Sequence, residues 1–309
     1  MSKIPVIIDC DTGVDDALAL LAAYQLPQLD IQAITTVAGN VTLEKTTRNT
    51  LQVLDLIGAK TPVYKGAALP LFREQVVAPY IHGESGLNNL ILPDPARKPE
   101  ETAACDAIYQ YARKFPGELE IIAVGPLTNL GLALVKYREL PGLLKRIIIM
   151  GGAAVGGNTT PAAEFNIYVD PEAADIVFRC GVPVHMCGLD VTMKSFVTPE
   201  EMEDFAKLGT PVGKFVRDVT QGVLDFSIQH GVPGMCMHDP LTVIYAADNS
   251  LFTFEEAGVR IELKGKITYG KTVTDIYSDK QFEEKNAVVV TDLDHAAFKK
   301  KLFDLIAKY

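Results

Sequence analysis

The stretch Val6–Leu20, VIIDCDTGVDDALAL, decides the fold, because it joins an apolar run to a helical pattern through a short acidic loop. The run Val6–Ile8 ends in an aspartate, a Thr-Gly pair follows, and apolar residues then recur at helical spacing. This order predicts a buried strand, a tight loop and a helix.

Carboxylates gather in this stretch, at Asp9, Asp11, Asp15 and Asp16. Asp9 and Asp11 are two residues apart at a strand end, so we expect their side chains to point the same way. Asp15 and Asp16 fall in the first turn of the helix, where the helix dipole favours negative charge. Because the dipole alone does not hold four repelling acids together, a cation is expected among them. The alternative is that Asp15 and Asp16 only cap the helix while Asp9 and Asp11 are solvated.

The ligand chemistry limits which cation this would be. Carboxylate oxygens are hard donors, which favours Ca²⁺ or Mg²⁺ over Zn²⁺. An EF-hand is excluded, because Gly13 takes the fifth loop position and Leu20 the twelfth, where a bidentate glutamate belongs.

Composition excludes several classes of protein. The 309 residues are 48% hydrophobic and carry a net charge of −10, which argues against a nucleic-acid partner. No apolar run approaches the roughly 20 residues of a membrane span, and Met1–Pro5 leave no room for a signal peptide. The five cysteines are scattered, as in a reducing compartment. A soluble cytoplasmic protein is expected.

Alternation of apolar strands with helices predicts the architecture. The expected strands after the first are 30–37, 61–64, 119–124, 146–150, 182–186, 258–263 and 286–291. The expected helices are 42–58, 100–115, 171–180, 198–207, 212–230 and 294–308, with others opening near Thr128 and His238. Continuously apolar strands between helices indicate a single doubly wound α/β domain, 1–309, with a mainly parallel sheet covered on both faces. Its site should lie at the carboxyl ends of the strands, where Asp9, Asn40, Val124 and Met150 fall.

Two segments lack periodicity or are rich in glycine, and we expect both to be mobile loops beside the site: 66–98 and 225–237. A third, glycine-rich segment follows the strand that ends at Met150. Its glycines are wrongly spaced for a dinucleotide loop. Asn158, Glu164 and Asn166 instead offer donors and acceptors suited to vicinal hydroxyls, although each alone could be a loop-capping group.

Histidines supply the candidate acids. His185 lies within an apolar strand and is expected to be a core residue, whereas His82 and His238 lie in loop-like surroundings. No nucleophile-elbow pattern is present, so covalent catalysis by serine is not supported.

At these residues the chain resembles the inosine-uridine-type nucleoside hydrolases, which split nucleosides into ribose and free base. The segment 9–17, DCDTGVDDA, looks like the N-terminal signature of that family. Further family motifs follow in order over almost the whole chain: 33–40, 124–130, 150–152, 164–166 with 170–174, and 238–240.

The resemblance implies a Ca²⁺ ion, one per subunit, and a ribose pocket. The implied calcium ligands are Asp11, Asp16, the backbone carbonyl of Val124, and Asp239. The implied substrate-binding residues are Asp15, Asn40, Met150, Asn158, Glu164, Asn166 and Asp239. Asp11 would also be the general base, His238 the leaving-group acid, and His82 a catalytic neighbour of the base.

The implied reaction is hydrolysis of the N-glycosidic bond of pyrimidine ribonucleosides, inosine, or both, by a homodimer or homotetramer. The chain has no tryptophan, so the subgroup that stacks purines between tryptophans does not fit. Phe226 and His230 could touch the base. Two alternatives are a haloacid-dehalogenase-like Mg²⁺ phosphohydrolase, which also uses an Asp-x-Asp pair, and a non-catalytic nucleoside-binding protein.

Overall fold

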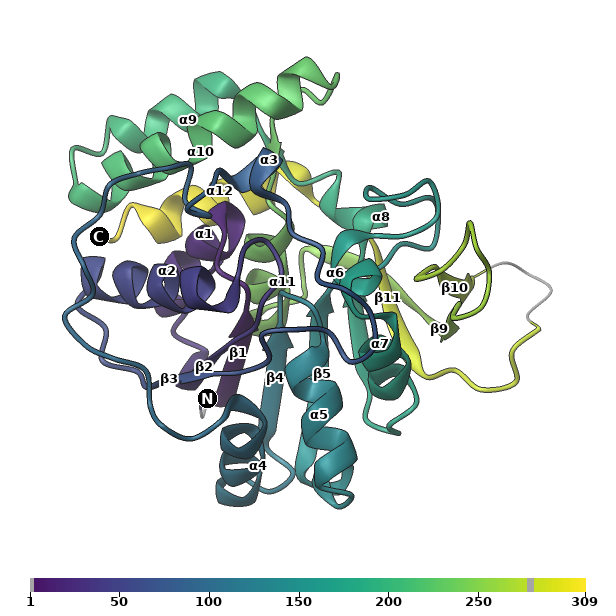
Figure 1. Ribbon diagram of the computed structural model, residues 1–309. Helices are drawn as coiled ribbons and strands as arrows, with labels where there is room; N and C mark the ends of the chain where they lie inside the picture. Colours follow the sequence, from purple (N-terminus) through teal and green to yellow (C-terminus); the bar gives the residue numbers. More distant parts are fainter. Residues whose placement is uncertain (1–2, 277–280) are drawn as a thin grey trace.

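A nine-stranded sheet forms the centre of the molecule, with helices on both of its faces (Figure 1). The computed structural model describes residues 3–276 and 281–309. The strand order is β10-β9-β11-β6-β5-β4-β1-β2-β3. Its strands are β1 (Ile4–Cys10), β2 (Leu29–Thr36), β3 (Val63–Lys65), β4 (Leu119–Ala123), β5 (Leu144–Met150), β6 (Val184–Cys187), β9 (Phe252–Ile261), β10 (Thr272–Asp275) and β11 (Ala287–Leu293).

Seven of these strands run parallel, from β3 at one edge to β11, and β9 and β10 then run antiparallel to their neighbours. The expectation of a mainly parallel, doubly wound sheet is therefore confirmed. From β1 the chain moves outward through β2 and β3, and it returns to place β4 on the other side of β1. The carboxyl ends of β1 and β4 consequently flank the point where the winding reverses, which is where open α/β sheets bind ligands.

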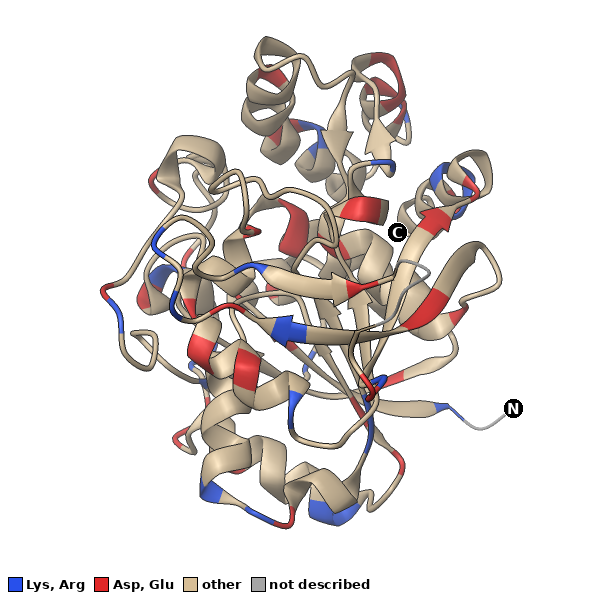
Figure 2. Cartoon of the chain, turned by 90° about the vertical axis from the view of Figure 1, so that its right-hand side faces the viewer, with Lys and Arg blue, Asp and Glu red and all other residues tan. Residues whose placement is uncertain are grey.

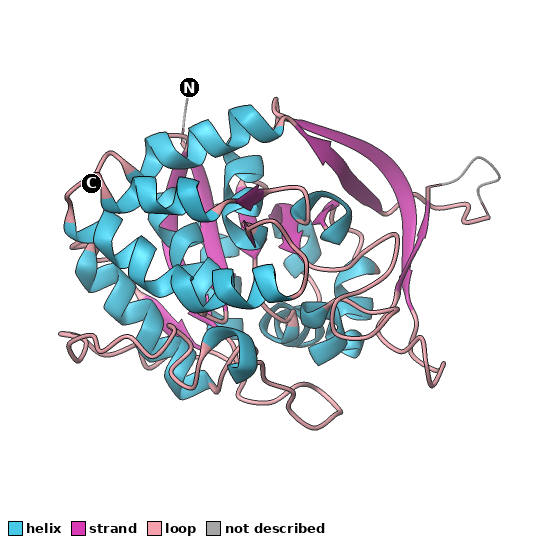
Figure 3. Ribbon diagram, turned by 90° about the horizontal axis from the view of Figure 1, so that it is seen from above, coloured by secondary structure: helices cyan, strands magenta, loops and turns pink. Residues whose placement is uncertain are grey.

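The helices fall into two layers, which Figure 3 shows from above. The longer ones are α1 (Val14–Tyr24), α2 (Leu43–Leu56), α4 (Ala104–Lys114), α5 (Thr128–Lys136), α7 (Pro171–Phe178), α9 (Pro199–Ala206), α10 (Pro211–Gln229), α11 (His238–Ala247) and α12 (His295–Ile306). The short ones are α3 (Pro79–His82), α6 (Phe165–Val169), α8 (Leu189–Thr192) and the 3₁₀ helix η1 (Leu140–Leu143). A two-stranded sheet, β7 (Phe196–Val197) with β8 (Met235–Cys236), precedes α11.

Each face of the sheet has its own apolar core, because successive side chains of a strand point to opposite faces. Val6, Ile8 and Cys10 of β1 join the core beneath α1, α11 and α12. Ile7 joins the second core, beneath α4, α5 and α7. Acidic and basic residues are interspersed over the side of the chain drawn in Figure 2. In the described ranges, no helix combines the length and the apolar character that a bilayer span needs.

Several elements differ from the sequence expectation. β9 begins at Phe252, earlier than expected, and β10, α3, α6, α8 and the β7–β8 pair were not expected. Residues 225–229 are the end of α10, so the expected loop 225–237 begins only after Gln229. The segment 66–98 is mostly irregular apart from α3.

Candidate active site

A cavity of about 250 Å³ opens at the carboxyl ends of the parallel strands. Of the residues expected in the site, its lining includes Asp15, Asn40, His82, Val124, Met150, Asn158, Glu164, Asn166, His238 and Asp239. Asp11 and Asp16 are not among the described residues that line it. Both are instead hydrogen-bonded to Asn40, which does line it.

Three carboxylates converge at one side of this cavity. Asp15 and Asp16 come from the first turn of α1, and Asp239 comes from the first turn of α11. One oxygen of each lies within 4.8 Å of the others. α1 packs against α11, which explains how residues so distant in sequence meet. The group includes Asp15, which the family resemblance assigned to the ribose, and it does not include Asp11.

Asp16 is fixed by the loop that precedes its own helix. One of its oxygens accepts a hydrogen bond from the Asp11 N–H (3.1 Å), and the other accepts from the Gly13 N–H (2.9 Å). That second oxygen also accepts from Asn40 Nδ2 at 3.0 Å. The backbone N–H of Asn40 donates to Asp11 Oδ2 at 2.7 Å. Asn40 therefore connects the loop that follows β2 to the acidic loop.

Gly13 is required by this close packing. A Cβ at this position would lie 2.7 Å from Asn40 Nδ2 and 2.7 Å from His82 Nδ1. The turn therefore brings the backbone against two pocket side chains, which explains the glycine between the paired aspartates.

The electrostatics of the cluster fit a bound cation. Burial and the charge of Asp16 raise the pKa of Asp11 and raise that of Asp15 to about 7. Burial and the neighbouring carboxylates also raise the pKa of Asp239 well above its usual range. The Oδ1 atom of Asp11 is buried, and no group among the described residues forms a hydrogen bond with it. A cation would stabilise the charged form of these hard oxygen donors.

Asp9 lies apart from this cluster. It shares the β1 face of Ile7, and its Oδ1 accepts hydrogen bonds from Thr35 and from Asn129 of α5. Burial raises its pKa to about 7. The alternative in which Asp9 and Asp11 are solvated is excluded, because both are buried.

Three imidazoles line the cavity, and the two that were expected as acids, His82 and His238, each have one nitrogen engaged. His82 Nδ1 accepts the Val14 N–H at the start of α1 (3.2 Å), so the neutral ring carries its hydrogen on Nε2. His238 Nδ1 is hydrogen-bonded to Thr192 Oγ1 at 2.9 Å. Burial lowers the pKa of both rings to about 4, and the neighbouring His238 contributes to the shift of His82. Both imidazoles are therefore neutral at pH 7.

Three of the expected ribose residues, Asn158, Glu164 and Asn166, lie in the segment between β5 and the end of α6. Glu164 caps α6, because its carboxylate accepts the N–H groups of Asn166, Ile167 and Gly152. Asn158 Oδ1 accepts the Phe165 N–H at 2.9 Å. These residues are thus capping groups and pocket-lining groups at once.

Asn166 connects this loop to the strand ends beside it. Its Nδ2 donates to the backbone carbonyl of Val124 at 2.9 Å and to that of Met150 at 3.1 Å. The Val124 carbonyl, which the resemblance assigns to the cation, therefore already accepts one hydrogen bond. A carbonyl oxygen has a second lone pair.

The start of the unexpected strand β10 and the residue before it hold the loop after β5. Lys271 Nζ donates to three loop carbonyls, those of Ala153, Ala154 and Gly156. Asp190 of α8 accepts the N–H of Ala154 (2.7 Å). The sequence held no local signal for these contacts, because Lys271 lies in a polar segment without periodicity.

Three aromatic side chains, Tyr80, Phe226 and His230, form an aromatic wall of the cavity. Phe226 lies in α10 and His230 directly follows this helix, and their rings are stacked with centroids 4.1 Å apart. The ring centroid of Tyr80, in α3, lies 6.2 Å from that of Phe226. All three line the cavity. Tyr80 was not expected from the sequence. Met193 and Cys236 contribute further apolar lining.

Comparison with known proteins gives a consistent result. Residues 6–300 match the family model described as inosine-uridine preferring nucleoside hydrolase. The pyrimidine-specific ribonucleoside hydrolase RihA of Citrobacter koseri is 44% identical over 313 residues, which cover 99% of each chain. A purine-preferring ribonucleoside hydrolase from Gardnerella vaginalis matches with a TM-score of 0.93 and 34% identity over 98% of each chain. The plant nucleoside hydrolase PpNRh1 matches with a TM-score of 0.92 and 34% identity over 99% of each. This chain belongs to the inosine-uridine preferring nucleoside hydrolase family.

Proposed function

We propose that this protein hydrolyses the N-glycosidic bond of ribonucleosides, with a Ca²⁺ ion in the acidic cluster. The observation that carries the proposal is the convergence of buried, mutually repelling carboxylates with two imidazoles in one cavity. Membership of the nucleoside hydrolase family removes the phosphohydrolase alternative. A binding protein without activity would need the carboxylates and the pocket but not the imidazoles.

Asp16, Asp239, Asp11 and the Val124 carbonyl would hold the cation, with Asp15 beside them. When bound, Ca²⁺ supplies a Lewis acid that lowers the pKa of water and offers positions for the 2′- and 3′-hydroxyls of ribose. The unpartnered Oδ1 of Asp11 and the 4.8 Å grouping of Asp15, Asp16 and Asp239 support this assignment.

The chain's own groups then divide the work of glycosidic cleavage, which passes through an oxocarbenium-like state. Asp11 accepts the proton of the attacking water. Asn158, Glu164 and Asn166 orient the ribose, and the carboxylates beside the ring stabilise its developing positive charge.

The leaving base needs a proton, and His238 is the group we assign to donate it. Its ring lines the cavity next to Asp239, and Thr192 fixes its orientation through Nδ1. The free His238 ring is neutral at pH 7. To act as the acid, it would need a higher pKa in the substrate complex, or it would need to take up a proton at one ring nitrogen as the other nitrogen donates one. His82 Nε2–H is a second donor in the same cavity. General acid catalysis of this kind is worth about 10²–10⁴-fold.

Uridine and cytidine are the proposed preferred substrates, ahead of inosine. Relatives at 43–44% identity are named pyrimidine-specific, whereas the purine-preferring structure is 34% identical. The wall of Phe226 and His230 supplies a stacking surface without tryptophan.

A reducing-sugar assay with uridine, cytidine, inosine and adenosine, with and without EGTA, tests the proposal. Ribose release that is lost on chelation is expected, with the pyrimidine nucleosides hydrolysed fastest. Absence of release from all four nucleosides would refute the proposed reaction.

A further inference from the structure

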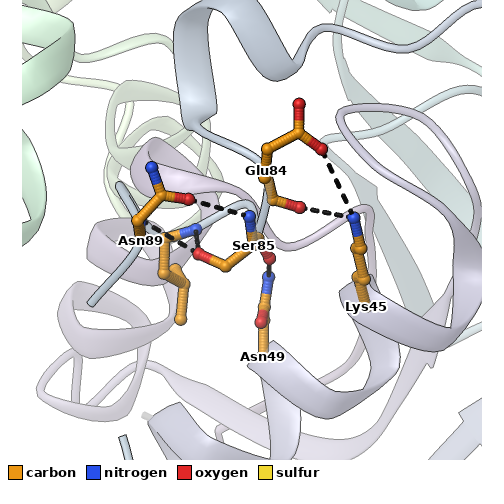
Figure 4. Close-up of polar contacts among 6 residues, drawn as sticks. Lys45, Asn49, Glu84, Ser85 and Asn89 are labelled. Carbon is orange, nitrogen blue, oxygen red and sulfur yellow. Dashed lines mark hydrogen bonds and ion pairs between the residues drawn. The ribbon is translucent and has the colours of Figure 1, made fainter. Parts of the chain in front are cut away.

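One face of α2 holds the second half of the 66–98 segment. Lys45, Arg48, Asn49 and Gln52 are spaced as neighbours on one side of a helix. Each binds this segment: their partners are the Glu84 carbonyl, Asp94, the Ser85 carbonyl, and the Leu92 and Pro93 carbonyls. The contacts to Glu84 and Ser85 are drawn in Figure 4. Residues 84–94 are therefore fastened to the helix layer.

Asn49 differs from the other three because it reaches into the acidic loop as well. Its buried Nδ2 donates to the Ser85 carbonyl at 2.9 Å and to the Thr12 carbonyl at 2.9 Å. The two hydrogens of one amide thus join the turn between Asp11 and Asp15 to the segment that follows His82.

The connection ends close to the imidazole. The carbonyl of His82 accepts the Asn88 N–H (2.8 Å), and the ring accepts the Val14 N–H. The segments 12–14 and 82–88 are consequently joined at two points, the His82 ring and the Asn49 amide. Gly86 packs directly on this amide, since a Cβ there would lie 2.6 Å from Asn49 Nδ2.

We propose that Asn49 is a positioning residue that holds the His82 imidazole in register with the acidic cluster. This inference rests on the proposed function. It also means that residues 84–94 are held against α2 outside the cavity, whereas Ala78, Tyr80 and Ile81, which line it, come before them.

Asn49→Asp is the sharpest variant, because it keeps the shape of the side chain and removes both donors. We expect kcat for uridine to fall about tenfold or more, because small misplacement of a catalytic group costs up to ~10²-fold. Hydrolysis of p-nitrophenyl riboside should change little, because p-nitrophenolate departs without a proton. Arg48→Ala, which removes an exposed ion pair on the same helix face, is the matched control and should behave as wild type.

Two further measurements separate positioning from general damage. Adding Asn49→Asp to a His82→Gln variant should cost little more than His82→Gln alone, because both changes remove the same contribution. Hydrogen exchange of the amides of 83–90 should become faster in Asn49→Asp and stay unchanged in Arg48→Ala. If Asn49→Asp does not fold, Gly86→Ala displaces the loop from the other side and should give the same pattern.

Equal loss on uridine and p-nitrophenyl riboside, or no loss on either, would overturn the proposal. If the wild-type protein released no ribose, the proposed function would have failed. The exchange measurement would then decide by itself whether Asn49 holds the segment, and unchanged exchange would refute it.

Discussion

Removing a carboxylate from the acidic cluster should stabilise the protein when no cation is present. Oxygens of Asp15, Asp16 and Asp239 lie within 4.8 Å of one another and are buried. Two unit charges at that separation repel by about 3.5 kcal/mol at an effective dielectric constant of about 20. Because burial and these neighbours raise the pKa of Asp239, the cation-free protein meets this cost as repulsion or as proton uptake on folding. Asp239→Asn removes the cost in either form. We therefore expect the cation-free variant to unfold at a higher temperature than the cation-free wild type.

The expected shift follows from the size of the chain. An unfolding entropy of about 2.1 cal/mol/K per residue over 309 residues converts ~3.5 kcal/mol into a rise of about 5 °C. Calcium should raise the melting temperature of the wild type and leave that of Asp239→Asn unchanged, because the variant has lost a ligand. Calorimetry near neutral pH, in calcium and in EGTA, measures both effects.

Asp9→Asn is the matched control, because Asp9 is a buried carboxylate outside the group of three. This variant should keep the full response to EGTA even if its melting temperature falls. Equal EGTA responses in wild type and Asp239→Asn would refute the assignment of the cluster as a cation site.

Four other changes test the remaining assignments. Asp11→Ala should abolish ribose release from uridine, and a variant that keeps most of its activity in the reducing-sugar assay would exclude Asp11 as the base. His238→Ala should slow uridine far more than p-nitrophenyl riboside, whereas equal losses would remove it as the acid. Phe226→Ala should raise KM for uridine several-fold with a smaller change in kcat, and an unchanged KM would exclude stacking on the base. Burial lowers the pKa of His185 to about 4, below its value of about 6.5 in an unfolded chain, so stability is present above pH 6.5 and is lost as pH falls toward 4. In urea titrations at successive pH values, His185→Gln should flatten this loss, and an unchanged slope would contradict it.

The sequence predicted the strand positions well where a strand is buried on both faces. β1, β4 and β5 each contain a run of buried aliphatic residues, 6–8, 121–123 and 147–150, and β6 is mostly buried as well. β10 was missed because Thr272–Asp275 is a polar edge strand, whose pairing with β9 is set by tertiary contacts and not by a local pattern. β7 and β8 have two residues each, which is too short for any periodicity.

Several of the expected site residues lie together in the cavity, whereas the contacts that hold them were not predicted from the sequence. His82, Asn158 and Glu164 were expected in the pocket and are there. Their partners were not foreseen: Asn49 lies mid-helix on α2, and Lys271 lies more than 100 positions along the chain from the carbonyls it binds. Contacts between segments so distant in sequence leave no trace in local spacing.

The pairing of α1 with α11 has a consequence for protein synthesis. The acidic loop leaves the ribosome well before Asp239 and the helix that carries it, which lie more than 200 positions further along the chain. The Tyr309 hydroxyl, which also follows Asp239 in the chain, donates to the Leu21 carbonyl of α1. A nascent chain therefore carries its aspartates without the partner that completes the cluster, and cation affinity should arise only late in translation.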